Sequence, residues 1–147
     1  MVTFLLFLSL APIISSPVSW HFAAAGTEDG KVLVTLTAEV EEGWHMYATE
    51  LPSDEGPLPT IFRFKESTDY TIAEQLNGPE PVEEFDNNFG VMVRHHSGTP
   101  KFTVVVEPTT KQPFTVEGEV EYMVCNDVTC LPPKVVPFSI TIEPRTR

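Results

Sequence analysis

The chain has little cysteine, few basic residues and no long apolar run, and each shortage excludes a class of protein. Cys125 and Cys130 are the only cysteines among 147 residues. The chain is therefore neither a disulfide-stapled miniprotein nor a four-cysteine zinc protein. Nine Lys and Arg stand against 21 Asp and Glu, for a formal charge of -12, which repels the phosphates of nucleic acids and anionic lipids. We therefore expect no nucleic-acid partner.

Proline is plentiful by contrast, and its abundance together with a period-two pattern predicts strands. The 14 prolines argue against long helices. Apolar and polar residues alternate strictly over residues 31–40, as expected for a half-buried strand. Further strands are predicted at residues 18–25, 44–50, 60–64, 70–76, 90–96, 102–106, 114–122 and 136–142. This spacing predicts an all-β fold, a two-sheet antiparallel β-sandwich of immunoglobulin-like type.

The start of the chain is interpreted as a targeting segment. An apolar run over residues 4–14 ends in Ser15-Ser16-Pro17. The run is too short to span a bilayer, which takes about 20 residues, but it suits a signal peptide. The alternative is a first buried strand. We expect residues 1–16 to be a signal peptide and residues 17–147 to be one exported domain.

Residues 121–133, with the sequence EYMVCNDVTCLPP, hold the densest chemistry of the chain. The parity of the preceding strand places Cys125 in phase with Glu121, so we expect Cys125 to leave the strand on its solvent side. Asn126 and Asp127 predict a tight turn, and the two prolines after Cys130 end regular pairing. The cysteines should then face each other across a hairpin end, close enough for a disulfide.

Such a disulfide has two interpretations, and the residues alone leave both open. Closing a ring of six residues removes only about 2 kcal/mol of unfolded-state entropy, roughly half the effect of a bridge between distant strands. The small ring at a sheet end favours thiol exchange. The alternative is a permanent bridge in a non-redox, immunoglobulin-like binding or adhesion module. The C-x4-C spacing and the absence of a following helix suit a carrier of electrons better than a self-activating oxidoreductase.

Three segments, VEYMVCNDVTCLPP, EEGWHMYATELP and EPVEEFDNNFG, together resemble one family. It is the family of N-terminal periplasmic domains of the thiol:disulfide interchange protein DsbD, the disulfide bond corrector family. The resemblance covers residues 17–142. It implies an immunoglobulin-like sandwich that takes electrons from a membrane-embedded donor and passes them to thioredoxin-fold periplasmic proteins, including disulfide isomerases and cytochrome c maturation factors. It implies a protein-disulfide reductase component without a bound cofactor, and we expect a monomer.

The resemblance also implies roles for the two thiols. Cys130 matches the thiol that attacks a partner and forms the mixed disulfide, and Cys125 matches the thiol that resolves it. The cysteines here enclose four residues, one fewer than in the best-known members, so a tighter ring is expected. Those members continue into a membrane bundle and a thioredoxin-like domain. We therefore expect either that the chain is a fragment or that its electron donor is a separate protein.

A cap over the disulfide is implied as well. Tyr47 and, less closely, His45 match aromatic positions beside the cysteines. Residues 84–89 fall where the family has a cap loop whose phenylalanine shields the disulfide. The region is longer here, which leaves Phe85 and Phe89 both open as the shield. We expect the whole segment 81–90 to be a flexible loop.

The histidines and the acidic rows receive structural interpretations. His95 and His96 adjoin on opposite faces of a predicted strand, so they cannot hold one ion together, and no metal site is expected. We interpret both as solvated strand positions. The row Glu117, Glu119 and Glu121 is interpreted as a solvated sheet face.

Overall fold

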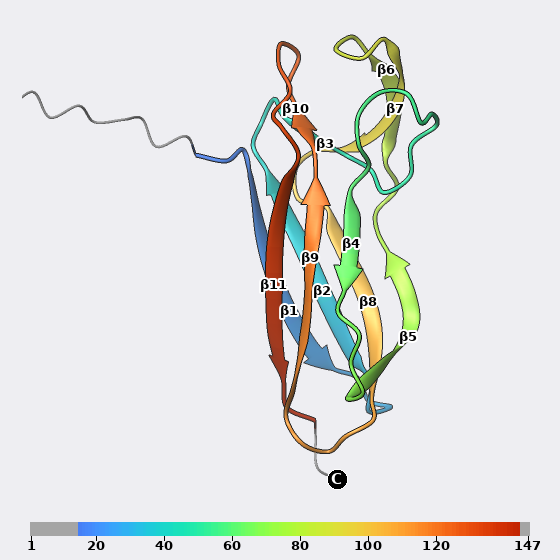
Figure 1. Ribbon diagram of the computed structural model, residues 1–147, viewed down its shortest axis with the longest axis vertical. Coiled ribbons are helices and arrows are strands. Elements are labelled where there is room, and N and C mark those ends of the chain that lie inside the picture. Colours follow the sequence, from blue (N-terminus) through green and yellow to red (C-terminus); the bar gives the residue numbers. More distant parts are fainter. Residues whose placement is uncertain (1–14, 145–147) are drawn as a thin grey trace, which may run out of the picture.

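The strand pattern of the sequence is realised throughout the folded chain. The computed structural model describes residues 15–144, and within this range it contains strands and no helix (Figure 1). The predicted signal peptide, residues 1–16, lies outside the described residues except for its last two. The strands are β1 (Val18–Gly26), β2 (Val32–Val40), β3 (His45–Tyr47), β4 (Ile61–Phe64), β5 (Tyr70–Asn77), β6 (Val82–Asp86), β7 (Val91–His96), β8 (Lys101–Pro108), β9 (Phe114–Tyr122), β10 (Val124–Cys125) and β11 (Lys134–Ile142).

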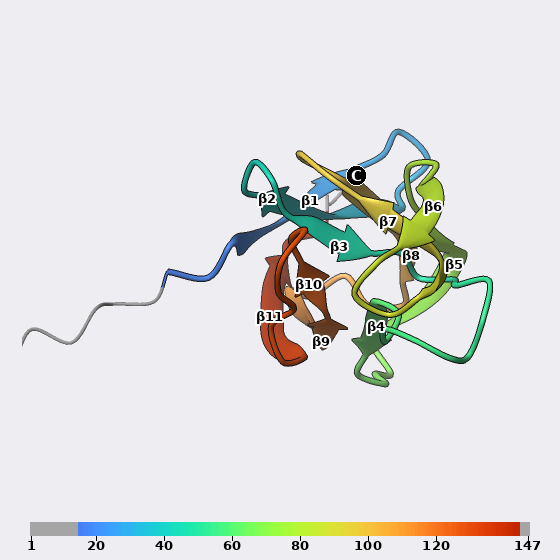
Figure 2. The ribbon, with the colours of Figure 1, turned by 90° about the horizontal axis from the view of Figure 1, so that it is seen from above.

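The strands form three antiparallel sheets rather than the two that were expected. The first sheet has the order β1-β2-β8-β5, and the third has the order β11-β9-β4. These two sheets face each other as the layers of the immunoglobulin-like sandwich (Figures 1 and 2). The second sheet, β10-β3-β7-β6, lies at one end of the sandwich (Figure 1). The all-β sandwich is confirmed, and the additional sheet creates a distinct end to the molecule.

The hydrophobic core fills the space between the two layers. In β2 every second side chain, from Val32 to Val40, is buried. Val116 and Val120 of β9 face them from the third sheet and are likewise fully buried. Each such side chain contributes about 1.5–3 kcal/mol to folding when it leaves water. Period-two alternation therefore produces the layered core directly.

Gly118 in β9 allows a close approach that no other residue would permit. A Cβ atom at this position would lie 2.2 Å from the carbonyl oxygen of Arg63 in β4 and 2.6 Å from the ring of Phe138 in β11. Phe138 is paired with Gly118 in the sheet and covers the space that a side chain would fill. A side chain at this position would therefore force β4 or Phe138 to move.

The outer face of the third sheet carries the acidic row as predicted. Lys65 pairs with Glu117 at 2.9 Å, and Arg63 lies 3.1 Å from Glu119 and 3.2 Å from Glu121. The pairs are partly or wholly exposed, so their effect on stability is small. The row is a charged sheet face and takes no part in the chemistry of the cysteines.

The expectation of a flexible loop over residues 81–90 is wrong for its first half. Residues 82–86 form β6, which pairs with β7 from Val82 opposite His95 to Asp86 opposite Val91. Only residues 87–90 form a turn, in which Gly90 has a φ of 71° that favours glycine. The result is a β-hairpin at the edge of the second sheet.

Candidate functional site

One face of the second sheet collects side chains from four strands around the disulfide. Residues that lie opposite each other in neighbouring strands share a face of the sheet. Cys125 in β10 lies opposite His45 in β3, and Tyr47 in β3 lies opposite His95 in β7. Asp86 of β6, opposite Val91, belongs to the same face. Sheet register therefore brings together residues that are far apart in the sequence.

The two cysteines form the disulfide that the hairpin pattern predicts. Their Cα atoms are 4.1 Å apart, and the two residues are bridged as antiparallel neighbours. Asn126 closes the turn: its backbone NH donates to the carbonyl of Thr129 at 2.9 Å, and its side-chain oxygen accepts from the NH of Thr129 at 2.8 Å. The NH of Leu131 donates to Val124 at 3.0 Å. Backbone hydrogen bonds therefore support the hairpin alongside the disulfide.

The expectation that Cys125 lies on the solvent side is wrong. Cys125 is 0% exposed, whereas Cys130 is half-buried. The strand does not continue through Met123, because β9 ends at Tyr122 and β10 joins β3 in a different sheet. The parity of β9 therefore does not carry over to Cys125. Of the two cysteines, Cys130 is the more exposed residue.

Reduction of the disulfide should leave the domain folded. The ring of six residues accounts for about 2 kcal/mol of a total stability that is typically about 5–15 kcal/mol. The turn also keeps the hydrogen bonds of Asn126 and Leu131. Circular dichroism of the reduced protein at room temperature is expected to retain the native strand signal. Unfolding on reduction would instead identify the bridge as structural.

Tyr47 and Asp86 form a buried polar pair next to Cys125. The Tyr47 hydroxyl donates to Oδ2 of Asp86 at 2.5 Å and lies 3.0 Å from Sγ of Cys125. Tyr47 is 0% exposed and Asp86 is also buried. Asp86 Oδ1 accepts from the backbone NH groups of Asn88 at 2.7 Å and Phe89 at 3.2 Å. The carboxylate thus fixes both the Tyr47 hydroxyl and the turn of the hairpin.

Burial and hydrogen bonding determine the protonation states of Tyr47 and Asp86. Burial raises the pKa of Asp86, but the hydrogen bonds from Tyr47, Asn88 and Phe89 outweigh burial, so the pKa lies below its ordinary value. Burial and the neighbouring Asp86 together raise the pKa of Tyr47 far above neutral pH. At neutral pH the site therefore holds an anionic carboxylate and a protonated phenol.

Two imidazole rings lie next to this pair. The ring of His45 is edge-on to Tyr47 at 5.4 Å and lies 4.6 Å from the ring of His95. His45 Nε2 is 3.7 Å from Oδ2 of Asp86, and His95 Nε2 is 2.6 Å from Oε1 of Glu84. His95 and His96 lie on opposite faces, yet both are buried rather than solvated, because the ring of His45 packs against His95 and the ring of Phe102 packs against His96.

The structure separates the two candidate shielding residues. Phe89 packs against the cluster formed by Tyr47, Val93 and Cys125, and its ring is edge-on to Tyr47 at 6.1 Å. Phe85 is 56% exposed and lies on the other face of the hairpin, where it pairs with Met92. Phe89 is therefore on the cysteine side of the hairpin and Phe85 is not.

Sequence reasoning missed Asp86 and His95 as neighbours of the cysteines. A local signal existed for Asp86, because Asp-Asn-Asn before Phe-Gly favours a turn in which the Asp side chain accepts backbone NH groups. No local signal existed for His95, whose position depends on pairing with Tyr47, a residue 48 positions away. Within residues 15–144 no group of three or more His, Cys, Asp or Glu side chains is arranged to hold a metal ion.

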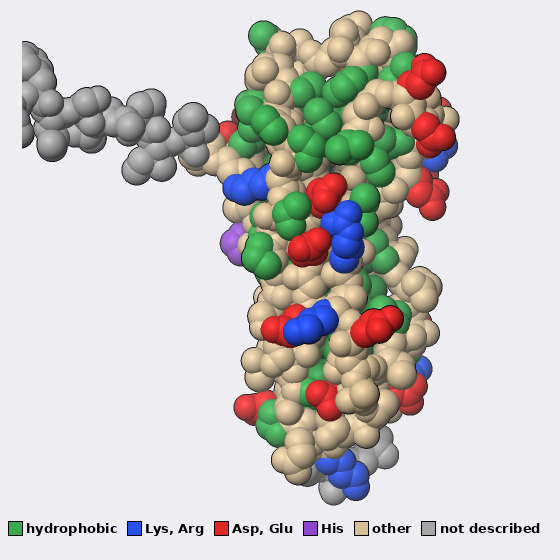
Figure 3. All heavy atoms as spheres, in the orientation of Figure 1, with side chains coloured by type: hydrophobic (Ala, Val, Ile, Leu, Met, Phe, Trp, Pro, Cys, Tyr) green, Lys and Arg blue, Asp and Glu red, His purple; other side chains and the backbone are tan. Residues whose placement is uncertain are grey.

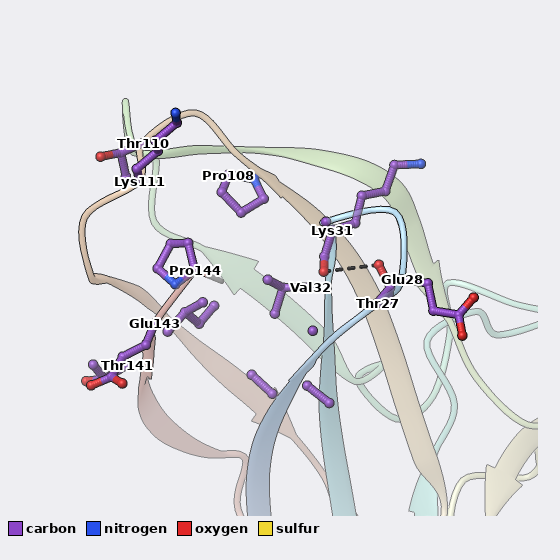
Figure 4. A pocket seen from close by; sticks show the side chains of 15 residues that line it. Thr27, Glu28, Lys31, Val32, Pro108, Thr110, Lys111, Thr141, Glu143 and Pro144 are labelled. Atoms are coloured by element: carbon purple, nitrogen blue, oxygen red, sulfur yellow. Dashed lines mark hydrogen bonds between the residues drawn. The ribbon is translucent and has the colours of Figure 1, made fainter. Parts of the chain in front are cut away.

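A pocket lies at the end of the sandwich opposite the disulfide. It has a volume of about 460 Å³ and opens between the ends of β1, β2 and β11. Ala24, Ala25 and Val32 line it, and Lys31 and Lys111 lie on opposite sides of its rim (Figure 4). The pocket contains no cysteine or histidine. It is therefore unrelated to the disulfide chemistry.

The two ends of the molecule also differ in their surfaces. Hydrophobic side chains gather over the end that carries the second sheet, whereas charged pairs occupy the middle of the same face (Figure 3). The exposed apolar residues of the disulfide turn and of the β6–β7 hairpin are Val128, Val82, Phe85 and Met92.

In the described part of the chain no helix has the length and apolar character needed to cross a membrane.

Comparisons with known proteins agree with this architecture. Residues 13–141 match the family model described as "Thiol:disulfide interchange protein DsbD, N-terminal". A search of curated proteins found no match. The reduced N-terminal domain of DsbD from Neisseria meningitidis is similar, with 18% identity, a TM-score of 0.55, and coverage of 86% of this chain and 90% of that one.

Two further solved structures have the same fold. The N-terminal periplasmic domain of ScsB from Proteus mirabilis has 13% identity and a TM-score of 0.60, and the match covers 91% of this chain but 49% of that one. The N-terminal domain of DsbD from Neisseria meningitidis, solved in complex with the N-terminal domain of PilB, has 17% identity and a TM-score of 0.56, and the match covers 92% and 97% of the two chains. At these identities the likeness establishes the fold.

Proposed function

This chain belongs to the family of DsbD N-terminal domains, and we propose that it relays reducing equivalents by thiol-disulfide exchange through Cys125 and Cys130. Its electron donor is a membrane-embedded domain or protein, and its acceptors are thioredoxin-fold proteins of the periplasm, including disulfide isomerases and cytochrome c maturation factors. In this role the chain is a protein-disulfide reductase component that uses no bound cofactor. Residues 1–16 direct export and residues 17–147 form the working domain, as a monomer.

The observation that carries this proposal is the environment of the disulfide. A bridge that only staples two strands does not require a polar group on its sulfur, yet Cys125 Sγ lies 3.0 Å from a hydroxyl that a buried carboxylate orients. Perturbed titratable groups beside a reactive atom are typical of chemical sites. The small ring adds to the argument, because it stabilises the fold little.

The two cysteines differ in exposure, which supports different roles. In the reduced protein the Cys130 thiolate attacks a disulfide of the partner, forms an S–S bond with one partner sulfur and releases the other as a thiolate. Cys125 then attacks Sγ of Cys130, closes the intramolecular disulfide and releases the second partner thiol. The half-buried Cys130 is reachable by a partner, whereas Cys125 is enclosed.

The apolar end of the molecule is the surface on which a partner would dock. Val128 at the tip of the disulfide turn is 87% exposed, and it follows Cys125 by three residues. The solved complex of the Neisseria DsbD N-terminal domain with the PilB N-terminal domain, and the periplasmic assignment of the ScsB domain, support the proposed kind of partner and the proposed location.

A redox titration against glutathione tests the proposal. A structural bridge resists reduction and has a potential below about -300 mV, whereas a relay equilibrates near the potentials of its partners, higher than that value. We therefore expect the dithiol and disulfide forms to coexist in glutathione buffers and to interconvert reversibly. A disulfide that stays oxidised throughout would favour the alternative, a binding or adhesion module with a permanent bridge.

A further inference from the structure

We propose that His45 is a positioning residue that accepts the proton of Cys125 through Asp86 and Tyr47 when Cys125 resolves the mixed disulfide. The inference rests on the proposed exchange function and adds to it a residue and a pH dependence. It depends on the contacts among β3, β6 and β10 on the cysteine face of the second sheet.

The first step of the argument is a proton count around the Tyr47 hydroxyl. A hydroxyl carries one hydrogen, but two acceptors lie within reach of it, Oδ2 of Asp86 at 2.5 Å and Sγ of Cys125 at 3.0 Å. With the disulfide closed, the sulfur of Cys125 is a weak acceptor, and the Tyr47 hydroxyl donates its hydrogen to Asp86. When Cys125 becomes a thiolate, two buried anions share one hydrogen. The proton that Cys125 loses must therefore be held close by.

His45 is the group placed to hold it. Its Nε2 is buried, has no hydrogen-bond partner and lies 3.7 Å from Oδ2 of Asp86. A small rotation of the ring would close this gap to a hydrogen bond. His45 in β3 is also the cross-strand neighbour of Cys125 in β10, so the series of contacts ends beside the residue from which the proton starts.

A small cavity connects His45 with solvent. It has a volume of about 230 Å³ and lies between the β6–β7 turn and the disulfide turn. Among its lining residues are His45, Asp86, Asn88 and Asp127. Water entering this space can remove the proton from the imidazole after each turnover, while Cys125 itself stays dry.

The charges that face His45 keep it neutral and ready to accept. Burial lowers the pKa of His45, and the neighbouring His95 lowers it further, whereas Asp86 and Glu84 of β6 act in the opposite direction. Tyr47 on the same strand is uncharged at neutral pH, and Asp127 faces the cavity from the disulfide turn. The net effect is a pKa below the ordinary 6.5, so the imidazole is a base at neutral pH.

The step balances in atoms and electrons. Sγ of Cys125 forms a bond with Sγ of Cys130, and the bond between Cys130 and the partner sulfur breaks. The partner leaves as a thiolate and is reduced, while the two cysteines are oxidised. The hydrogen of the Cys125 thiol passes to the Tyr47 hydroxyl, the hydroxyl hydrogen passes to Asp86, and a proton arrives at His45 Nε2.

The test follows resolution of the mixed disulfide with glutathione as a function of pH. The reduced protein is mixed with oxidised glutathione, quenched in acid, and the glutathione adduct on Cys130 is counted by mass spectrometry. In the unchanged protein the resolution rate should level off above the pKa of His45. In His45→Phe, which keeps a ring but no base, the rate should continue to rise with pH through the range in which the rate of the unchanged protein has levelled off.

The two profiles should differ by about tenfold near neutral pH, a modest effect for a general base, and converge in alkali. His21→Phe is the matched control, because His21 is an exposed residue of β1 that pairs with Glu39; its profile should match the unchanged protein. His95→Gln should raise the pH at which the rate levels off, because it removes the electrostatic repulsion by which His95 lowers the pKa of His45. Parallel profiles for His45→Phe and the unchanged protein would overturn the role of His45, whereas failure of the unchanged protein to form either the adduct or the intramolecular disulfide with oxidised glutathione would overturn the exchange function itself.

Discussion

Cys125→Ser should trap a thioredoxin-fold partner as a stable mixed disulfide through Cys130, whereas Cys130→Ser should trap little or none. The reason is access: the side chain of Cys125 is 0% exposed beneath Tyr47 and Phe89, and Cys130 is half-buried at the start of the chain segment that leaves the turn. The reduced variants are incubated with a thioredoxin-fold protein that keeps only one active-site cysteine, supplied as a mixed disulfide with a small leaving thiol so that no partner thiol can reverse the exchange, and the complexes are counted on non-reducing gels. The difference is close to all-or-none, because removal of the resolving thiol stops the reaction at the mixed disulfide.

The control for this experiment is the variant that lacks both cysteines, which should form no complex. Both single variants should also unfold at similar denaturant concentrations, since each removes the same six-residue ring. Equal trapping by the two single variants would remove the assigned roles, and so would the absence of trapping by either. Partial unfolding would expose Cys125 and allow Cys130→Ser to trap a partner as well. Short incubations below the unfolding transition avoid this side reaction.

Strictly alternating segments of the fold could be predicted from the sequence. In β2 and β9 one side of the strand faces the core and the other faces solvent. Apolar residues therefore mark the core side and polar residues mark the solvent side. The disulfide hairpin was also predictable, because Asn126 and its neighbours favour a turn through local hydrogen bonds. In these elements the conformation depends on neighbouring residues, so a short stretch of sequence is enough to predict it.

The errors share one physical cause, which is that pairing between distant strands decides them. The burial of Cys125 depends on β10 joining β3 rather than continuing β9. The strand β6 lies at a sheet edge, and only its last residue, Asp86, is buried, so it lacks the one-sided apolar pattern of a core strand. The contact between Tyr47 and Asp86 spans 39 positions. No short window of sequence contains that information.

Phe89→Ala should accelerate reduction of the disulfide by dithiothreitol severalfold, because Phe89 packs over the cysteine cluster as a cap. An aromatic ring packed on the cysteine cluster excludes solvent and small thiols at little polar cost. The turn that carries Phe89 is short, and a hydrogen bond of 3.0 Å from Nδ2 of Asn88 to the carbonyl of Asn126 latches it to the disulfide turn. Opening this latch exposes the sulfurs without unpairing a strand.

Phe85→Ala is the matched control for the cap, since it removes the same side chain from the same hairpin at a position that is 56% exposed and lies on the opposite face of the hairpin from Asp86. Its reduction rate should equal that of the unchanged protein. Asn88→Ala should accelerate reduction as well, because it frees the turn while keeping the Phe89 ring. Rates are measured with dithiothreitol in excess, and strand content is followed by circular dichroism so that a faster rate can be separated from a loosened fold. If Phe89→Ala and Phe85→Ala are reduced at the same rate, the ring of Phe89 is part of the packing of the hairpin and does not guard the disulfide.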